Sequence, residues 1–158
     1  MSAILHAWTV ACRRSLVDGD TGDTALEVLD AIDVPAAVAT VAATLAIPHR
    51  LDVVSLWWRD DATAPAIDQA RLAWHDPRGA RLAEARLVVG FASGQRRLRT
   101  RHIFETIGVA GVGTHELIVR LGEAGGVVAR IPVEVRAPGR DAMAPAERGA
   151  TDPRARPG

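Results

Sequence analysis

The chain has 158 residues and a mass of 16.8 kDa, and its 19 basic residues balance 19 acidic ones. This length and a hydrophobic content of 48% suit a single domain with its own core. Every basic residue is arginine, and lysine, tyrosine and asparagine are absent. The sequence therefore excludes a lysine Schiff base, a P-loop lysine and an N-glycosylation acceptor.

The expected compartment is the cytoplasm. No apolar run approaches the roughly 20 residues that cross a bilayer. The first residues include Asp18 and Asp20 and lack the basic start and apolar run of a signal peptide. The single cysteine, Cys12, cannot form an internal disulfide, which suits a reducing compartment.

Short apolar runs with a period of two predict β-strands along most of the chain. The segment Asp76 to Gly79 has the Pro and Gly positions of a type I turn, which predicts a hairpin. We expect strands at 3–11, 51–59, 67–75, 80–91, 97–107, 114–121 and 127–136.

Two segments are ambiguous. Residues 24–32 fit a strand, but their leucine spacing also suits a helix, and we favour the strand. Residues 36–46 are rich in alanine and follow Pro35, as in a short helical link. The whole pattern predicts an all-β, antiparallel two-sheet β-sandwich, Ig-like or similar, with that one link.

The last part of the chain differs in composition from the rest. Residues 137–158 contain four of the nine prolines, mixed with Gly, Ala, Arg and Asp, and Met143 is their only sizeable apolar residue. Such a segment buries too little surface to offset its ordering entropy. We expect a β-sandwich domain at 1–136 and a disordered tail at 137–158.

The order of these features resembles a known group of proteins. A first strand AILHAWTV is followed by the turn VDGDTGD, the link DVPAAV, a series of hairpins, and the closing strands THELIVRL and VVARIPVEV. This order is similar to that of small bacterial β-sandwich proteins with a domain of unknown function, over residues 3–136. His115 stands where that group usually has an aromatic residue. The resemblance implies a fold and no activity.

Catalytic and metal-binding patterns are incomplete. The run from His115 to Val119 begins like a zinc-protease helix, but Val119 replaces the second histidine. Cys12 and His6 are about 20 Å apart on an extended strand, too far for a nucleophile and its base. We therefore expect a protein that is not an enzyme and that has no metal site and no cofactor.

The Trp57-Trp58 pair suggests an interaction surface. Neighbouring strand residues face opposite ways, so if Val54, Leu56 and Trp58 face the core, Trp57 lies on the outer surface with Val53 and Ser55. An outward Trp needs a cover, and the candidates are a neighbouring arginine, the 36–46 segment or another protein chain. The favoured function is therefore a non-catalytic module that binds an unknown protein partner or forms a homo-oligomer.

The segment Arg96 to Arg101 suggests an alternative function. Arg97, Arg99 and Arg101 share one face of a strand at a spacing of about 7 Å, comparable with successive phosphates of a single strand. We call these three residues the arginine stripe. We favour the interpretation that the stripe is a solvated outer face. The alternative is that it binds a polyanion or a single-stranded nucleic acid.

Overall fold

The protein is all-β in the computed structural model, which describes residues 3–18, 20–41 and 43–137. The strands and the single short helix are β1 (Leu5–Val17), β2 (Thr24–Val28), β3 (Ala31–Asp33), α1 (Ala36–Ala39), β4 (Leu45–Ile47), β5 (Leu51–Trp58), β6 (Ala66–His75), β7 (Arg81–Phe91), β8 (Arg97–Phe104), β9 (Ile107–Val109), β10 (Gly113–Leu121) and β11 (Gly126–Arg136). No helix in the described ranges has the length and apolar character to cross a membrane. The all-β prediction is confirmed.

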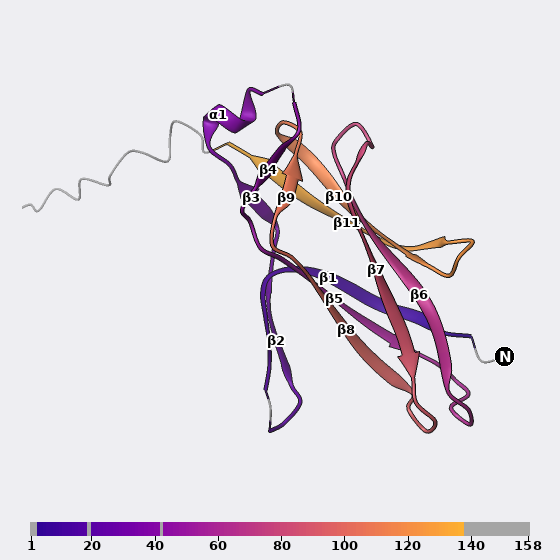
Figure 1. The fold of residues 1–158 in the computed structure, drawn as a ribbon. Helices are drawn as coiled ribbons and strands as arrows, with labels where there is room; N and C mark the ends of the chain where they lie inside the picture. The colour runs from indigo at the N-terminus through magenta and orange to yellow at the C-terminus, as the bar shows by residue number, and fades with distance from the viewer. Residues whose placement is uncertain (1–2, 19, 42, 138–158) are drawn as a thin grey trace, which may run out of the picture.

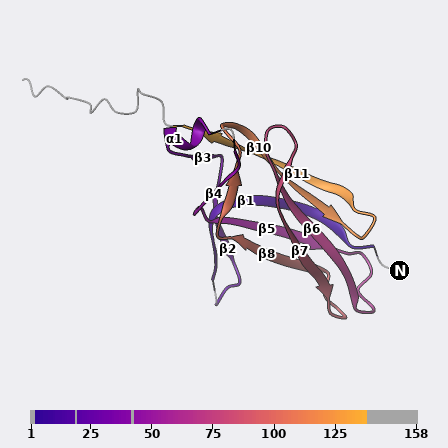
Figure 2. The same ribbon diagram turned by 45° about the horizontal axis from the view of Figure 1, so that its top comes forward.

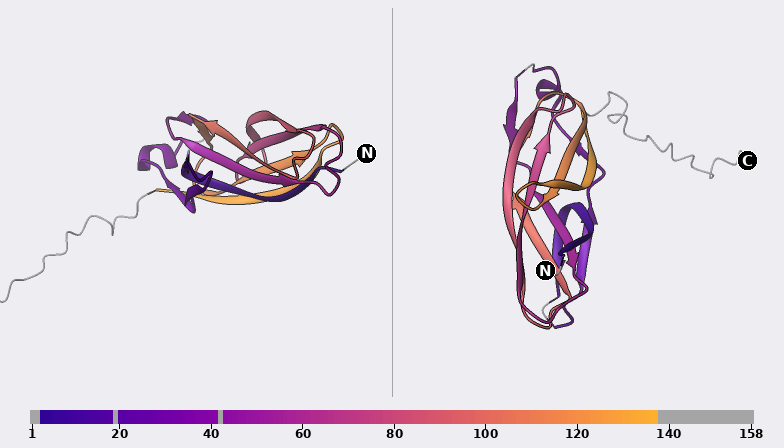
Figure 3. Two further views of the ribbon diagram at one scale, coloured as in Figure 1. Left: turned by 90° about the horizontal axis from the view of Figure 1, so that it is seen from below. Right: turned by 90° about the vertical axis from the view of Figure 1, so that its right-hand side faces the viewer.

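The strands form three sheets (Figure 1). A four-stranded sheet has the order β2-β1-β5-β8, a five-stranded sheet has the order β3-β11-β10-β6-β7, and β4 pairs with β9. Pairing is antiparallel except between β3 and β11. The molecule is elongated, and most strands run along its length (Figure 3).

The predicted hairpin of β6 and β7 is confirmed. The Gly79 amide donates to the Asp76 carbonyl at 2.9 Å, and the Asp76 carboxylate accepts from the amides of Arg78 and Ala80. Gly79 has φ +83°, a conformation that favours glycine, which explains the residue at this position.

The first ambiguous segment is resolved in favour of strands, and the second contains a short helix followed by a strand. Residues 24–32 form β2 and the start of β3, with Leu29 buried between them. The helical link is confirmed only for the four residues of α1, and the chain then enters β4. The predicted tail begins at Ala137, and its residues 138–158 lie outside the described residues.

One hydrophobic core draws side chains from both large sheets. Trp57 and Val53 come from β5, while Trp74 and Leu117 come from β6 and β10. The Trp74 indole donates to the Gly108 carbonyl at 2.8 Å, which satisfies its buried N–H. His115 is buried and stacks on Trp74, with ring centroids 5.4 Å apart. Its imidazole therefore packs in the core as an aromatic side chain would.

The predicted outward position of Trp57 is wrong. Trp57 is 0% exposed, whereas Trp58 is 38% exposed. The period of two is correct but its phase is reversed, because apolar residues occupy both faces of β5 and only Asp52, which has the parity of Trp58, marks the outer face. Inside the core, the Trp57 indole donates to the Thr100 hydroxyl at 2.8 Å.

The outer face of the four-stranded sheet is the face opposite the core, and it carries Asp52, Val54, Leu56 and Trp58 of β5. The register places the arginine stripe on the same face, with Arg97 beside Trp58, Arg99 beside Leu56 and Arg101 beside Val54. Three charged side chains beside each other cannot enter a dry core without partners. This sheet-wide constraint fixes which face of β5 is buried in the core.

The end of β1 bends over this outer face. Residues 5–12 of β1 pair with β5, and residues 12–17 pair with β2, with a register shift between Cys12 and Arg14. Such a bulge bends a strand. Figures 1 and 2 show the end of β1 and β2 turned away from the direction of the first half of β1. We call the described residues 13–18 and 20–28 the β1–β2 arm.

Arg59 joins two loops at one end of the molecule. Its buried guanidinium donates to the carbonyls of Gln95 at 2.9 Å, Ala64 at 2.5 Å and Ala92 at 2.7 Å. The guanidinium also lies 5.2 Å from the ring centre of Phe91. Three fixed carbonyls match the fork of N–H donors that only arginine offers.

Replacing Arg59 tests this role. Arg59→Met should lower the free energy of unfolding by about 3 kcal/mol or more, because three carbonyls lose their donor. Arg59→Lys, with one ammonium, should cost less. Urea unfolding measures both, and a Met variant within about 0.5 kcal/mol of the wild type would contradict the assignment.

Candidate anion-binding site

A buried carboxylate organises the outer face of the four-stranded sheet. Asp52 lies between Leu51 and Val53 in β5, and its side chain points away from the core although it is fully buried. It is the cross-strand neighbour of Cys12 in β1 and of Ile103 in β8. The bend of the β1–β2 arm covers it.

Asp52 receives hydrogen bonds from three parts of the chain. Ser15 in the arm donates its hydroxyl at 2.7 Å and its amide at 3.1 Å. Arg50 donates its Nε at 2.8 Å, and Arg101 of β8 donates its Nη2 at 2.8 Å. Burial opposes ionisation, but the hydrogen bonds from Arg50, Ser15 and Arg101 outweigh it and hold the pKa of Asp52 well below its usual range.

The two arginines keep donors available to solvent. The side chains of Arg50 and Arg101 are 44% and 37% exposed, and they contact Asp52 through Nε and Nη2. Within the described chain, neither Nη1 group has a hydrogen-bond partner. Both guanidinium groups are therefore held in place on one side and open on the other.

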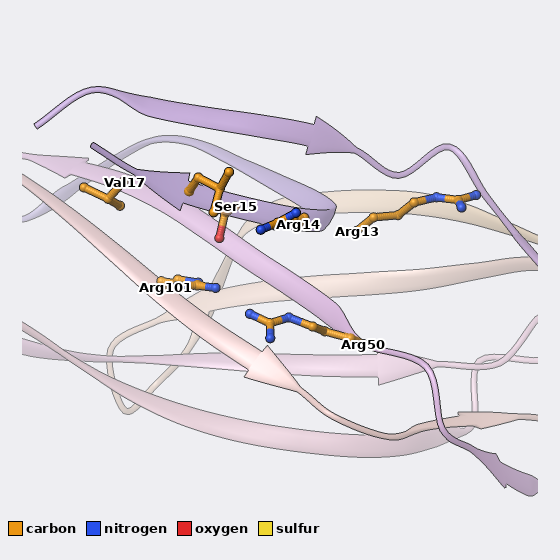
Figure 4. Close-up of a pocket in the computed structure, with 7 residues that line it drawn as sticks. Arg13, Arg14, Ser15, Val17, Arg50 and Arg101 are labelled. Carbon is orange, nitrogen blue, oxygen red and sulfur yellow. The ribbon is translucent and has the colours of Figure 1, made fainter. Parts of the chain in front are cut away.

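These arginines line an open cleft of about 630 Å³ beside the β1–β2 arm. It is lined by Arg13, Arg14, Ser15, Leu16, Val17, Arg50 and Arg101, and none of these described residues is acidic. Figure 4 shows the guanidinium groups of Arg50 and Arg101 close to one another below the Ser15 hydroxyl, while Arg13 extends away.

Arg14 adds a third cation to the cleft. It is exposed, and it forms no hydrogen bond or ion pair with any residue that the structure describes. Glu27 is its cross-strand neighbour in β2, but the two form no ion pair. Together with Arg13, these three arginines outnumber the one buried carboxylate, so the cleft is positively charged.

The predicted arginine stripe is present, and its members have different surroundings. All three residues are exposed on one face, as predicted. Arg101 belongs to the cleft, whereas Arg99 donates to the Thr24 hydroxyl and to the Gly22 carbonyl of the arm. Arg97 has no side-chain partner among the described residues, and it lies beside Trp58. The stripe is therefore divided by the arm.

Cys12 and His6, considered above as a nucleophile and its base, lie in different surroundings on β1. His6 shares a 2.7 Å hydrogen bond with Thr9, and Cys12 is buried. Burial, and then the charge of Asp52, raise the pKa of the Cys12 thiol. Within the described ranges, no group of three or more His, Cys, Asp or Glu side chains is placed to hold a metal ion.

Comparison with protein-family models finds no match for this chain, and comparison with curated proteins finds no similar sequence. The resemblance to the bacterial β-sandwich group therefore remains a prediction.

Sequence reasoning found Arg101 but missed Asp52, Arg50, Arg14 and Ser15 as a group. One signal was present, because a carboxylate inside the apolar run LDVVSLWW requires a partner if it is buried. The sequence could not identify the partners, since Ser15 and Arg101 are 37 and 49 residues away from Asp52.

Asp52→Asn tests the role of this carboxylate in folding. The variant should lose about 2 kcal/mol at pH 7, less than for a fully enclosed pair because both arginines are partly exposed. The folded-state pKa of Asp52 lies below its unfolded value, so its contribution is complete above about pH 5 and is lost as pH falls below about 4. The difference in unfolding free energy between wild type and variant should shrink over that acidic range. A difference that does not vary between pH 7 and 3 would contradict the assignment.

Proposed function

We propose that this protein is a non-catalytic module that binds a polyanion through arginines on the outer face of the four-stranded sheet. The observation that carries the proposal is the pair Arg50 and Arg101, which line an open cleft and are held by a buried carboxylate, while their Nη1 groups have no partner among the described residues. Arg14 completes the cleft with a guanidinium that has no partner among the described residues.

Guanidinium groups suit this role because they bind phosphate or sulfate oxygens through two parallel N–H donors. Two of the three are already ordered by Asp52, so less side-chain entropy is lost on binding. The net charge of the chain is zero, and attraction must therefore come from local clustering of cations.

We also propose that the two large sheets form a two-sheet β-sandwich, with β4 and β9 as a separate short pair. Supporting observations are the shared core of the two large sheets and the contacts of β1 with β11 and of β7 with β8. We also propose the cytoplasm as the compartment, because a single cysteine suits a reducing environment.

Protein binding or self-association is the second candidate function. With Trp57 in the core, the outer face of the five-stranded sheet offers a different surface, because Ile67 and Val88 are strongly exposed there. The register places them diagonally on neighbouring strands β6 and β7. A concentration-dependent sedimentation coefficient that Ile67→Ser abolishes would favour this function.

The polyanion proposal is tested with inorganic polyphosphate and heparin. The logarithm of the association constant should fall linearly with the logarithm of the salt concentration, because binding releases counterions from the polyanion. Arg14→Glu should weaken binding about tenfold and make the salt dependence shallower, since it removes one charged donor and adds a repulsive charge. The Arg14 side chain makes no hydrogen bond or ion pair with any described residue, so the variant should lose only a few tenths of a kcal/mol of stability, from the like charge that it places opposite Glu27.

Arg86→Glu is the matched control. Arg86 is exposed on β7, on the outer face of the other large sheet, and the substitution changes the net charge equally. It should alter affinity less than twofold. Absence of binding at low salt, or equal losses in the two variants, would contradict a local site.

A further inference from the structure

Trp58 lies at the other end of the same outer face. It is 38% exposed, and it lines a second cleft of about 510 Å³ with Ala7, Leu56, Arg59, Arg96 and Arg97. Arg97 is its direct cross-strand neighbour in β8. An indole and a guanidinium that has no side-chain partner among the described residues therefore stand side by side on the surface.

The neighbouring residues leave both groups accessible. Arg96 donates its Nη1 to the Asp60 carbonyl at 2.7 Å, which directs it toward the loop after β5. Arg99 is occupied by the β1–β2 arm through Thr24 and Gly22. Arg97 has no comparable side-chain contact in the described chain.

An exposed indole beside a cation suits the binding of a single-stranded nucleic acid. Bases of single-stranded nucleic acids stack on aromatic side chains, while arginines neutralise the adjacent phosphates. Inorganic polyphosphate has no ring to stack, and the bases of a duplex are already stacked on each other. The indole thus distinguishes a flexible strand with free bases from other polyanions.

We propose that the polyanion is a single-stranded nucleic acid, with one base stacked on Trp58 and its phosphate bound by Arg97. This inference rests on the proposed polyanion function and specifies its ligand. Arg97 and Arg101 are four residues apart in β8, so roughly 13 Å separates this position from the arginine cleft. A short strand therefore reaches both ends of the face.

The test uses full-length protein with dye-labelled oligo(dT), and polyphosphate of similar charge as competitor, followed by fluorescence anisotropy. Trp58→Leu retains an apolar side chain but removes the ring, and it should weaken oligo(dT) binding about tenfold. Trp58→Phe should restore most of that affinity. Neither variant should change polyphosphate affinity, because polyphosphate does not use the ring.

Ile67→Ala is the matched control, because it shortens an exposed apolar side chain on the outer face of the other large sheet. It should leave oligo(dT) affinity unchanged. A duplex of the same length should show no dependence on Trp58. Circular dichroism establishes that each variant is folded before it is compared.

The outcomes distinguish base stacking on Trp58 from polyanion binding by the arginine cleft. If Trp58→Leu leaves oligo(dT) binding unchanged while Arg14→Glu still weakens it, base stacking is refuted and polyanion binding stands. If Trp58→Leu weakens heparin as much as oligo(dT), the ring serves a sugar and the nucleic-acid assignment is overturned. If no polyanion binds the wild type, both proposals fail.

Discussion

The ionised, buried carboxylate of Asp52 is the interaction on which the outer half of this structure depends. A carboxylate in a strand between apolar neighbours is costly unless its oxygens are fully bonded. Here the donors come from the arm, from Arg50 just before β5, and from β8, so one side chain connects three segments. The bend of β1, the cover over β5 and the orientation of Arg50 and Arg101 follow from this requirement.

The same interaction links stability to binding. A surface arginine normally loses its conformational freedom when it meets an anion. At this site the folded protein has already ordered two of them, and each retains donors toward solvent. The buried charge lowers the positive charge of the cleft, but it fixes the geometry in which the remaining charge is presented. Arg99 differs from these two arginines, because its guanidinium donates to the Gly22 carbonyl of the arm.

Much of the fold could be predicted from the sequence, because alternation and turn residues act locally. The hairpin at Asp76 to Gly79 is an example, since its proline and glycine match the turn geometry without help from the rest of the chain. The shared face of Arg97, Arg99 and Arg101 was predictable for the same reason. Local alternation could not determine the phase of β5, where Trp57 and Trp58 are equally apolar. That choice depends on the charges that β8 brings to one face.

The site was less predictable than the strands. Its central residues meet only after β1 has bent, and the bulge between Cys12 and Arg14 has no clear signature in the sequence. Nothing near Asp52 in the chain indicates that Ser15 and Arg101 will bond to it. A buried carboxylate can be suspected from its apolar neighbours, but its partners depend on sheet order and on the bend of the arm.

The most direct test of this account is the affinity of Asp52→Asn for inorganic polyphosphate, measured by calorimetry at pH 7 where the variant is folded. The substitution removes a negative charge beside the cleft, so simple attraction favours tighter binding. If Asp52 acts by holding Arg50 and Arg101 in place, binding becomes weaker despite the added net positive charge. Affinity equal to or greater than that of the wild type would contradict the account.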